Sequence, residues 1–254
     1  MNPQNDKPLI SIITPSLNSE KFIRDNITSI LNQSYSNIEH VIVDGGSKDK
    51  TLSIVADLDP KAVVISEPDK GISDAFNKGI KMASGDIIAI LNSDDYYAHD
   101  VMHDVAEAYK NSDFNFILHG DIRFFNDGKS YRKKPRPLPD LFFYIDLPYY
   151  HPTVFVPRKI YEDVGLFDLT YKIAMDYDFL LRAKLKGYQF KCLPIIIAHF
   201  RLGGTANSNA AKCHKEVLHS QVSHGLNPYI CKLTFSLKLA VNYSKRLLIK
   251  FIGK

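Results

Sequence analysis

Short runs of β-branched and aliphatic residues alternate with helical patterns over residues 8–125. Such alternation is typical of parallel strands whose connecting helices cover the sheet. The predicted strands are Leu9–Ile13, Ile38–Val43, Ala62–Ile65, Ile87–Leu91 and Phe116–Leu118. With right-handed crossovers between them, they predict an α/β fold with a Rossmann-like, mostly parallel central sheet flanked by helices.

Two of the connecting helices have a clear apolar period. The periodic residues are Ile23, Ile27, Ile30 and Leu31 in the first helix and Ala75, Phe76, Ile80 and Ala83 in the second. A side-chain oxygen of Asn18 or Ser19 can cap the first helix. The second helix is predicted to stop by Gly85.

The pattern changes after residue 125. A turn signal at 126–128 is followed by a basic run over 129–136 and by aromatic residues over 142–150. A helix is predicted over Asp176–Leu185 and a strand over Lys191–Ala198. Residues 205–228 have weak periodicity, so we expect a linker with a short helix there.

The C-terminal segment predicts an amphipathic, basic helix. The apolar residues that share one face at helical spacing are Ile230, Leu233, Leu237, Val241, Leu248, Phe251 and Ile252. Lys232, Arg246 and Lys250 lie opposite, with Lys238 and Lys245 at the boundary. The pattern is typical of a helix lying on an anionic membrane surface, where each basic residue adds about 1 kcal/mol. The alternative is a terminal helix that packs on its own domain.

Composition narrows the class of protein. With 45% hydrophobic and 24% charged residues, the chain is predicted to be globular rather than disordered. Three cysteines, Cys192, Cys213 and Cys231, fit neither a disulfide framework nor paired zinc knuckles, which favours a reducing compartment. The sequence has no signal-peptide pattern and no window of about 18 apolar residues, so we expect neither secretion nor a membrane span.

Polar residues follow each of the first four predicted strands, over 14–18, 44–49, 67–71 and 92–95. Ligands of parallel sheets bind beyond the carboxyl ends of the strands, so these clusters should share one rim. The neighbouring carboxylates of Asp94 and Asp95 could hold a divalent cation, which in turn could neutralise a diphosphate. Alternatively, they cap a helix that begins near Ala98.

Six blocks occur in order along the chain: TPSLN, IEHVIVDGGSKDKT, EPDKGISDAFNKGI, ASGDIIAILNSDDYY, HPTVFV and IAMDYDFLLRA. Together they resemble family 2 glycosyltransferases of the GT-A fold, in particular bacterial enzymes that build O-antigen, capsule or exopolysaccharide. The resemblance covers roughly residues 8–205. It implies an inverting transfer of a sugar from a nucleotide-diphospho-sugar, usually a UDP-sugar, with Mn²⁺ or Mg²⁺ bridging the diphosphate.

The resemblance also implies a division of the chain. Residues 1–205 would form the GT-A domain, with a nucleotide-sugar-binding half over 8–125 and an acceptor-side half over 126–205. Residues 206–254 would form the linker and the basic amphipathic C-terminal helices.

The metal and donor sites follow from the same blocks. Asp94 matches the last acid of the family's DxD metal motif and Asn92 stands in place of the first, while Asp95 and His199 complete the predicted metal set. Asp44 matches the first acid of the DDGS block that faces the base, and Gly45 replaces the second. Phe76 occupies a place where many relatives carry an arginine. The other residues predicted to bind the nucleotide-sugar are Thr14, Pro15, Ser16, Asn18, Asp69, Asp74, Asn77, Ser93, His151 and Arg201, together with Asn92 and Asp94.

Asp176 matches the catalytic base of the family's ED motif, with Met175 in place of the preceding acid. An inverting displacement needs one carboxylate that takes the proton of the attacking acceptor hydroxyl. The alternatives are a first-turn acid favoured by the helix dipole, or Asp178 as the base. His199 and His151 could equally be structural histidines.

The resemblance implies a saccharide acceptor linked to undecaprenyl diphosphate, and a protein that is cytoplasmic and peripheral on the inner face of the cell membrane. The basic run over 129–136 could contact a lipid diphosphate or the membrane, or form a solvated hairpin. Nucleic acid is not an expected partner, because few aromatic residues, such as Phe235 and Tyr243, are interleaved with the C-terminal charges.

Three other functions compete. A nucleotidyltransferase or a dinucleotide dehydrogenase should have a glycine-rich loop after the first strand, where this chain has no glycine until Gly45. A catalytically impaired binding or assembly partner with the same fold would fit the substitutions at 45, 76, 92 and 175. The retained Asp94 and Asp176 argue against that alternative.

Overall fold

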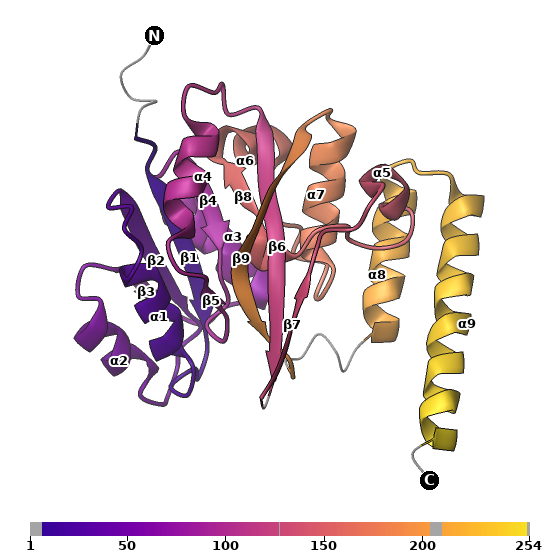
Figure 1. Cartoon of the computed structure of the whole chain (residues 1–254), viewed down its shortest axis with the longest axis horizontal. Coiled ribbons are helices and arrows are strands. Elements are labelled where there is room, and N and C mark those ends of the chain that lie inside the picture. Colours follow the sequence, from indigo (N-terminus) through magenta and orange to yellow (C-terminus); the bar gives the residue numbers. More distant parts are fainter. Residues whose placement is uncertain (1–6, 127, 204–209, 253–254) are drawn as a thin grey trace.

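The structure is a computed structural model that describes residues 7–126, 128–203 and 210–252. In this part of the chain, nine strands form one mixed sheet in the order β3-β2-β1-β4-β8-β6-β9-β5, with β7 paired to β6 (Figure 1). The strands are β1 (Ile10–Ser16), β2 (Ile38–Asp44), β3 (Val63–Ser66), β4 (Ile87–Ile90), β5 (Tyr96–Tyr97), β6 (Phe116–Asn126), β7 (Lys129–Lys133), β8 (Phe155–Pro157) and β9 (Gln189–Arg201).

The N-terminal half is the predicted parallel layer. β1 pairs in parallel with β2 and β4, and β2 pairs in parallel with β3. The register places Ser16 beside Asp44 and Asp44 beside Ser66, so β1, β2 and β3 end at one edge. The first four predicted strands are confirmed to within a few residues at each end.

The second half of the sheet departs from a simple parallel order. The fifth predicted strand, Phe116–Leu118, lies within the longer β6, and antiparallel β8 separates β6 from β4. β6 instead runs parallel to β9, with a register shift around Asp121. Gly120 allows this close pairing, because a Cβ there would lie 2.7 Å from the carbonyl oxygen of Leu193.

Helices cover both faces of the sheet. They are α1 (Ile23–Leu31), α2 (Thr51–Leu58), α3 (Ile72–Met82), α4 (Val101–Tyr109), α5 (Pro139–Phe142), α6 (Arg158–Val164), α7 (Met175–Leu185), α8 (Ala210–Ser223) and α9 (Pro228–Ile252), with a 3₁₀ turn, η2 (His151–Thr153). Side chains alternate along a strand, so Ile88 and Ile90 of β4 enter one buried cluster with α3, α6 and α7, whereas Ile87 and Ala89 enter another with α4.

The predicted side-chain cap of α1 is wrong. The cap position is Phe22 and has no side-chain hydrogen bond. The N–H groups of Phe22 and Ile23 donate instead to the backbone carbonyl of Ser19, each at 2.9 Å. The side chains of Asn18 and Ser19 are bound to neighbouring loops, so they are not available to the helix.

The C-terminal helices α8 and α9 pack beside α7 and α5 at one end of the molecule (Figure 1). Where the sequence predicts a linker with a short helix, α8 has 14 residues. The segment 204–209 that precedes α8 lies outside the described residues.

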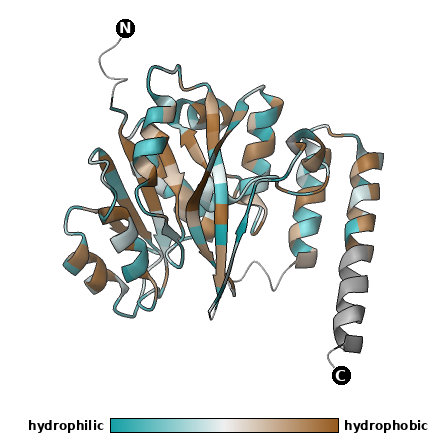
Figure 2. Cartoon of the chain, in the orientation of Figure 1, coloured by the Kyte–Doolittle hydropathy of each residue, from teal (hydrophilic) through white to brown (hydrophobic). Residues whose placement is uncertain are grey.

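One face of α9 contacts the body and another stays exposed. Cys231 is fully buried, and Oγ1 of Thr234 donates to the carbonyl of Tyr144 at 2.6 Å. Leu233 and Leu237, on the predicted apolar face, are 61% and 57% exposed. Figure 2 shows hydrophobic residues along the described part of this helix. The remaining predicted positions of the face, from Val241 on, lie outside the described side chains. In the described part of the chain, no helix is both long and apolar enough to cross a bilayer.

Candidate active site

The loops that follow β1, β2 and β4 meet at the carboxyl edge of the parallel strands. The N–H of Asn18 donates to Oγ of Ser47 at 2.8 Å, and Oδ1 of Asn18 accepts from the N–H of Lys48 at 2.9 Å. The hydroxyls of Ser19 and Ser93 lie 2.8 Å apart. Polar residues from three strand ends are therefore joined at the edge where such sheets bind ligands.

Asp44 is buried at the end of β2, and both of its carboxylate oxygens accept hydrogen bonds. Oδ2 accepts from the N–H of Gly46 at 3.0 Å, from the N–H of Ser47 at 2.9 Å and from the hydroxyl of Ser66 at 2.7 Å. Oδ1 accepts from the hydroxyls of Ser47 and Ser16. Burial opposes ionisation, but hydrogen bonds from Ser47 and Ser66 lower the pKa of Asp44 below its ordinary value. Asp44 is thus a carboxylate that organises the loop after β2.

Gly45 makes room for the carboxylate of Asp69. A Cβ at position 45 would lie 2.7 Å from Oδ2 of Asp69 and 3.4 Å from Cδ1 of Leu17. Oδ1 of Asp69 accepts from the N–H of Gly71 at 2.8 Å. Where the sequence resemblance implies a second acid after Asp44, an acid from the loop after β3 therefore occupies the neighbouring space.

Two buried oxygen atoms in the loop after β4 have no hydrogen-bond donor among the residues that the structure describes. They are Oδ1 of Asn92 and Oδ2 of Asp95, while Oδ1 of Asp95 accepts from the N–H of Arg201 at 3.0 Å. Buried acceptors are normally satisfied, so two such atoms in one loop fit a cation that takes oxygen ligands.

The charge of this loop also fits a cation. Burial raises the pKa of Asp94 and raises that of Asp95 further, because Asp95 also lies near the Asp94 carboxylate. Arg201 acts in the opposite direction on both groups without cancelling the shift. Mn²⁺ or Mg²⁺ held by Asn92, Asp94 and Asp95 would supply the missing positive charge, and both ions favour oxygen ligands.

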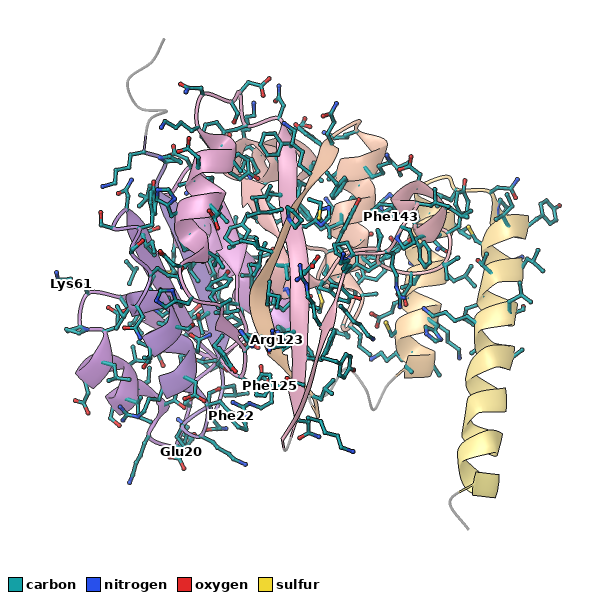
Figure 3. All side chains as sticks on the ribbon, viewed as in Figure 1. Glu20, Phe22, Lys61, Arg123, Phe125 and Phe143 are labelled. Atoms are coloured by element: carbon teal, nitrogen blue, oxygen red, sulfur yellow. The ribbon has the colours of Figure 1, made fainter. Side chains whose placement is uncertain are left out.

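His199 and Arg201 end β9 next to this loop. The His199 ring stacks on Tyr96 with centroids 4.6 Å apart, and burial lowers its pKa. The Arg201 guanidinium carbon lies 4.5 Å from the ring centroid of Phe22 and 4.6 Å from that of Phe125, two rings labelled in Figure 3.

Among the described residues, no three His, Cys, Asp or Glu side chains are grouped as a metal site. The four-residue metal set therefore stays a prediction, in which substrate phosphates and water would supply further ligands.

Asn26, on α1, supports the backbone of the loop after β4. Its side chain is fully buried, and Nδ2 donates to the carbonyls of Asn92 at 3.0 Å and Asp95 at 3.1 Å. The sequence interpretation missed this residue. The available signal was a polar side chain at helical spacing between the core residues Ile23 and Ile30.

A chain of buried polar side chains continues from Asn26 into the interior. Oδ1 of Asn26 accepts from the hydroxyl of Thr14 at 3.2 Å, and Oγ1 of Thr14 lies 3.0 Å from Nε2 of His40. Nδ1 of His40 lies 2.9 Å from Oδ2 of Asp59. The Thr14 side chain, predicted to contact the nucleotide-sugar, thus belongs to a network that braces the loop.

Two further residues of the predicted donor site hold neighbouring backbone. Asn77, on α3, exchanges two hydrogen bonds with the backbone of Phe167, at 2.8 and 2.9 Å. Oδ2 of Asp74 accepts from the N–H of Lys70 at 3.0 Å and lies 3.5 Å from Nζ of Lys78. Asn77 therefore fixes the segment that leads towards α7.

Asp176 lies in the first turn of α7 and lines a pocket with mainly apolar walls. Ile90 of β4, His151 of η2 and Phe167 line the same pocket. Because Ile90 is two residues before Asn92, the pocket adjoins the loop after β4. The structure thus brings His151 and Asp176 together, as the sequence analysis requires of one site.

The environment of Asp176 suits a general base. Burial raises the pKa of Asp176 to about 6, and the nearby charge of Asp146 adds to the shift. A hydrogen bond from the N–H of Tyr177 to Oδ1, at 2.7 Å, acts in the opposite direction. A carboxyl group whose pKa lies slightly below neutral pH is ionised there and still accepts a proton readily. The ring of His151 stacks on Phe76 with centroids 5.2 Å apart, and burial lowers the pKa of His151 to about 4, so this wall of the pocket is uncharged at neutral pH.

Comparison with known proteins decides the family. The family described as "Glycosyl transferase family 2" matches residues 11–171, which span all the loops described above and most of the pocket. The chain belongs to glycosyltransferase family 2.

Characterised and uncharacterised relatives agree with this assignment. The chain is 30% identical over 189 residues to an uncharacterized glycosyltransferase of Rickettsia typhi. The aligned residues make up 70% of this chain and 59% of the relative. The chain is also 27% identical over 212 residues to a PGL/p-HBAD biosynthesis glycosyltransferase of Mycobacterium bovis. That alignment makes up 79% of this chain and 80% of the relative. The chain therefore spans little more than half of the Rickettsia protein.

Solved structures show the same fold. The S. aureus TarS fragment 1–349 in complex with UDP-GlcNAc has a TM-score of 0.69 and 21% identity, covering 93% of this chain and 73% of that one. The mannosyltransferase PcManGT from Pyrobaculum calidifontis, in complex with GDP-Man and Mn²⁺, has a TM-score of 0.66 and 16% identity, covering 97% and 80%. The transferase has the GT-A fold of these proteins.

The structure gives Asp178 a role other than catalysis. Asp178 is 1% exposed, and Oδ2 accepts from Nε of Arg182 at 2.9 Å. Oδ1 accepts from the hydroxyl of Ser220 at 2.9 Å and lies 2.8 Å from Nε2 of His224. This carboxylate therefore ties α7 to α8, and the alternative in which Asp178 is the base has no support from its surroundings.

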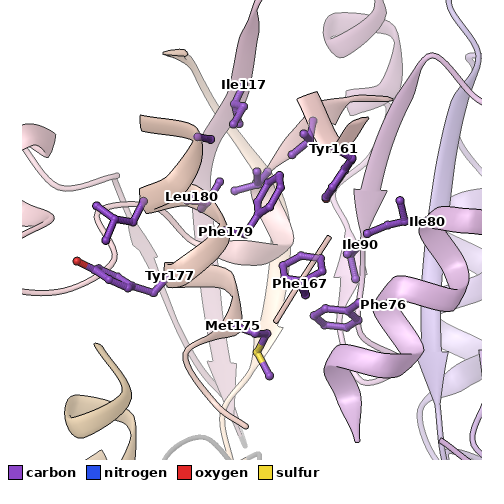
Figure 4. Packing of buried hydrophobic residues seen from close by; sticks show 14 of the residues in the cluster. Phe76, Ile80, Ile90, Ile117, Tyr161, Phe167, Met175, Tyr177, Phe179 and Leu180 are labelled. Carbon is purple, nitrogen blue, oxygen red and sulfur yellow. The ribbon is translucent and has the colours of Figure 1, made fainter. Parts of the chain in front are cut away.

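Two departures from the family pattern lie in one apolar cluster. Phe76 and Met175 are 2% and 5% exposed and belong to the same buried cluster as Phe167 (Figure 4). The resemblance implies a cation at position 76 and an acid at position 175. This chain has hydrophobic side chains at both positions, and both pack in the same buried cluster.

Proposed function

We propose that the transferase catalyses an inverting transfer of a hexose-type sugar from a UDP-sugar to a saccharide acceptor, as part of bacterial cell-surface polysaccharide synthesis. The observation that carries the proposal is the placement of Asp176 in a pocket that also contains the end of β4, next to the loop of Asn92, Asp94 and Asp95. A proton acceptor in a pocket whose wall ends next to a loop with carboxylates is what such a transfer needs.

The chemistry divides between these two groups. Asp176 accepts the proton of the acceptor hydroxyl while that oxygen forms a bond to the anomeric carbon. The bond between the anomeric carbon and the diphosphate oxygen breaks on the opposite face of the sugar, and the nucleoside diphosphate leaves with the electron pair. A divalent cation at the loop after β4 would stabilise the charge that develops on the diphosphate.

The donor assignment rests on the first two strand ends and on the neighbours. Asp44 lies at the edge where the resemblance implies the base, and Asn18 and Asp69, also predicted to bind the nucleotide-sugar, lie on the neighbouring loops. The TarS fragment was solved with UDP and with UDP-GlcNAc, which favours uracil, although PcManGT was solved with GDP-Man. UDP-GlcNAc is therefore the first donor probe and GDP-mannose the comparator.

The acceptor is proposed to be a saccharide linked to a lipid diphosphate such as undecaprenyl diphosphate, and the transferase to work at the cytoplasmic face of the membrane. Support comes from α9, where Leu233, Leu237 and Ile230 are exposed on one side. No acidic residue follows Glu216, whereas six basic residues do. An uncovered apolar face beside lysines fits an anionic lipid surface better than a helix packed wholly on its own domain.

Calorimetric binding of UDP, with GDP as comparator, tests the donor and the metal together. Wild type and Asp94→Ala are each titrated with and without Mn²⁺. We expect UDP to bind tightly only with Mn²⁺, and the variant to lose at least tenfold in affinity through loss of a cation ligand. If neither nucleotide binds under any condition, the protein is instead a non-catalytic partner with a transferase fold.

A further inference from the structure

Helix α8 contacts the short segment that leads into the catalytic helix. Oε2 of Glu216, on α8, accepts from three successive backbone N–H groups: Lys172 at 3.1 Å, Ile173 at 2.8 Å and Ala174 at 3.0 Å. Ala174 is the cap position of α7, and Asp176 is two residues further on.

Three N–H groups in a row form a concave anion-binding arrangement, and they lie at the positive end of a helix. Because backbone N–H groups near a helix start lack partners within the helix, they need an acceptor from elsewhere. Glu216 supplies that acceptor from a segment some 40 residues away in sequence. A single carboxylate therefore accepts from all three backbone N–H groups just before Asp176.

Two further contacts restrict the same segment. The hydroxyl of Tyr171 lies 3.0 Å from Nδ1 of His219 on α8, and the carbonyl of Tyr171 accepts from Oγ of Ser73 on α3 at 3.1 Å. The segment from Tyr171 to Ala174 is thus held between α3 on the donor side and α8 on the C-terminal side.

We propose that Glu216 is a positioning residue for the transfer reaction, because its carboxylate fixes residues 172–174 and so sets the place and direction of Asp176 in the pocket. This inference rests on the proposed role of Asp176 as the base. It makes the C-terminal helices part of the catalytic apparatus, although residues 172–216 lie entirely beyond the 11–171 match to the family.

Glu216→Ala is the test, with Glu216→Gln as the conservative variant and Glu39→Ala as a matched control. Glu39 also accepts three hydrogen bonds, from the hydroxyls of Ser11 and Ser84 and from the N–H of Ser84, but at the opposite end of the strands. Each full-length variant is compared with wild type by amide hydrogen exchange of residues 169–178, by UDP binding with Mn²⁺, and by the steady-state rate of UDP release from UDP-GlcNAc.

We expect Glu216→Ala to accelerate exchange of the 172–174 amides at least tenfold and to lower kcat about 10- to 100-fold. The donor KM and the UDP affinity should stay unchanged, because a small misplacement of the base lowers the rate of the reaction and not the binding of the donor. Glu216→Gln keeps one acceptor oxygen and should recover most of kcat. Glu39→Ala should change none of these three quantities, even where it lowers the melting temperature.

Unchanged exchange over 169–178, or a kcat equal to that of Glu39→Ala, overturns the positioning role of Glu216. Failure of the proposed function has a different signature. If Asp176→Asn keeps the wild-type rate, or wild type releases no UDP from any nucleotide-sugar, the base assignment is wrong, whatever the exchange data show for Glu216.

Discussion

Lys238 of α9 donates to Asp146, with Nζ and Oδ2 2.6 Å apart, and the charge of Asp146 in turn raises the pKa of Asp176. The C-terminal helix therefore contributes a compensating positive charge close to the proposed base. Lys238 also lies 3.4 Å from the carbonyl of Ile145, so its ammonium group is held against residues 145–146.

Replacing Lys238 by methionine should shift the pH dependence of turnover. The substitution leaves the charge of Asp146 uncompensated, which raises the pKa of Asp176 further above its value of about 6. Because the base must be ionised, the acidic limb of the pH–rate profile moves to higher pH, by about half a unit. Lys232→Met, a change on the same helix away from Asp146, should leave the profile in place, and an identical shift in both variants would contradict the argument.

Asp176→Asn should abolish turnover and yet stabilise the folded protein at neutral pH. The folded-state pKa of Asp176 is raised to about 6 by burial, so the ionised group costs stability as pH rises from its unfolded value through 6. Asparagine removes this cost, which is on the order of 1 kcal/mol at pH 7.5 once partial exposure is allowed for. Thermal unfolding at pH 7.5 should show a higher melting temperature for the variant, and at pH 4 the difference should vanish.

Asn26→Leu should weaken the cation-dependent binding of UDP. The leucine keeps the approximate volume but leaves the carbonyls of Asn92 and Asp95 without their buried donor, at a cost of about 1–3 kcal/mol in the free energy of unfolding. The loop should then hold Mn²⁺ less well, with UDP affinity about tenfold lower.

Gln33→Met is the control for that measurement. Gln33 also bridges buried backbone, since its Nε2 donates to the carbonyl of Ala98 at 3.0 Å and its Oε1 accepts from the N–H of Met102 at 3.1 Å. Its loss should destabilise the protein without changing UDP affinity. Equal losses of UDP affinity in both variants would mean that general destabilisation, not the support of the loop, controls binding.

The exposed face of α9 should carry binding to anionic membranes. Leu233→Asp combined with Leu237→Asp places two charges on that face, and we expect at least a tenfold loss of binding to phosphatidylglycerol-containing vesicles, with UDP binding retained. Leu31→Asp introduces a charge at another exposed leucine, 50% accessible on α1, and should not release the protein. If the double variant binds vesicles as well as wild type does, α9 is not the membrane contact.

The parallel half of the fold was predictable because apolar residues such as Ile12, Ile42 and Ile88 follow the pattern of buried strands. The order of β8, β6 and β9 was not, since it depends on pairing between residues far apart in sequence, as between Leu118 and Phe155. A short helix was predicted within 205–228, but the 14-residue length of α8 was not, for a local reason. Its buried positions include His214, Ser220 and Gln221, so its inner face is polar and gives no apolar period.

Some residues of the candidate site could likewise be proposed from the sequence, whereas others were found only from the structure. Asp94, Asp44 and Asp176 could be proposed from the sequence because each belongs to a motif. Asn26 and Glu216 were not, because each acts on backbone groups of a distant segment, and a backbone carbonyl or N–H leaves no trace in the sequence. The departures at 76 and 175 could be seen from the sequence, but their common burial could not.

Asp44 already has acceptor contacts to three serine hydroxyls and two backbone N–H groups before any donor binds. The loop after β2 therefore needs little rearrangement when a nucleotide arrives, and little conformational entropy is lost on that side of the site. We therefore expect this preformed loop to discriminate between bases by fit, without adjusting to a base that fits poorly. Conformational ordering on binding should then occur mainly where the sugar and the acceptor bind.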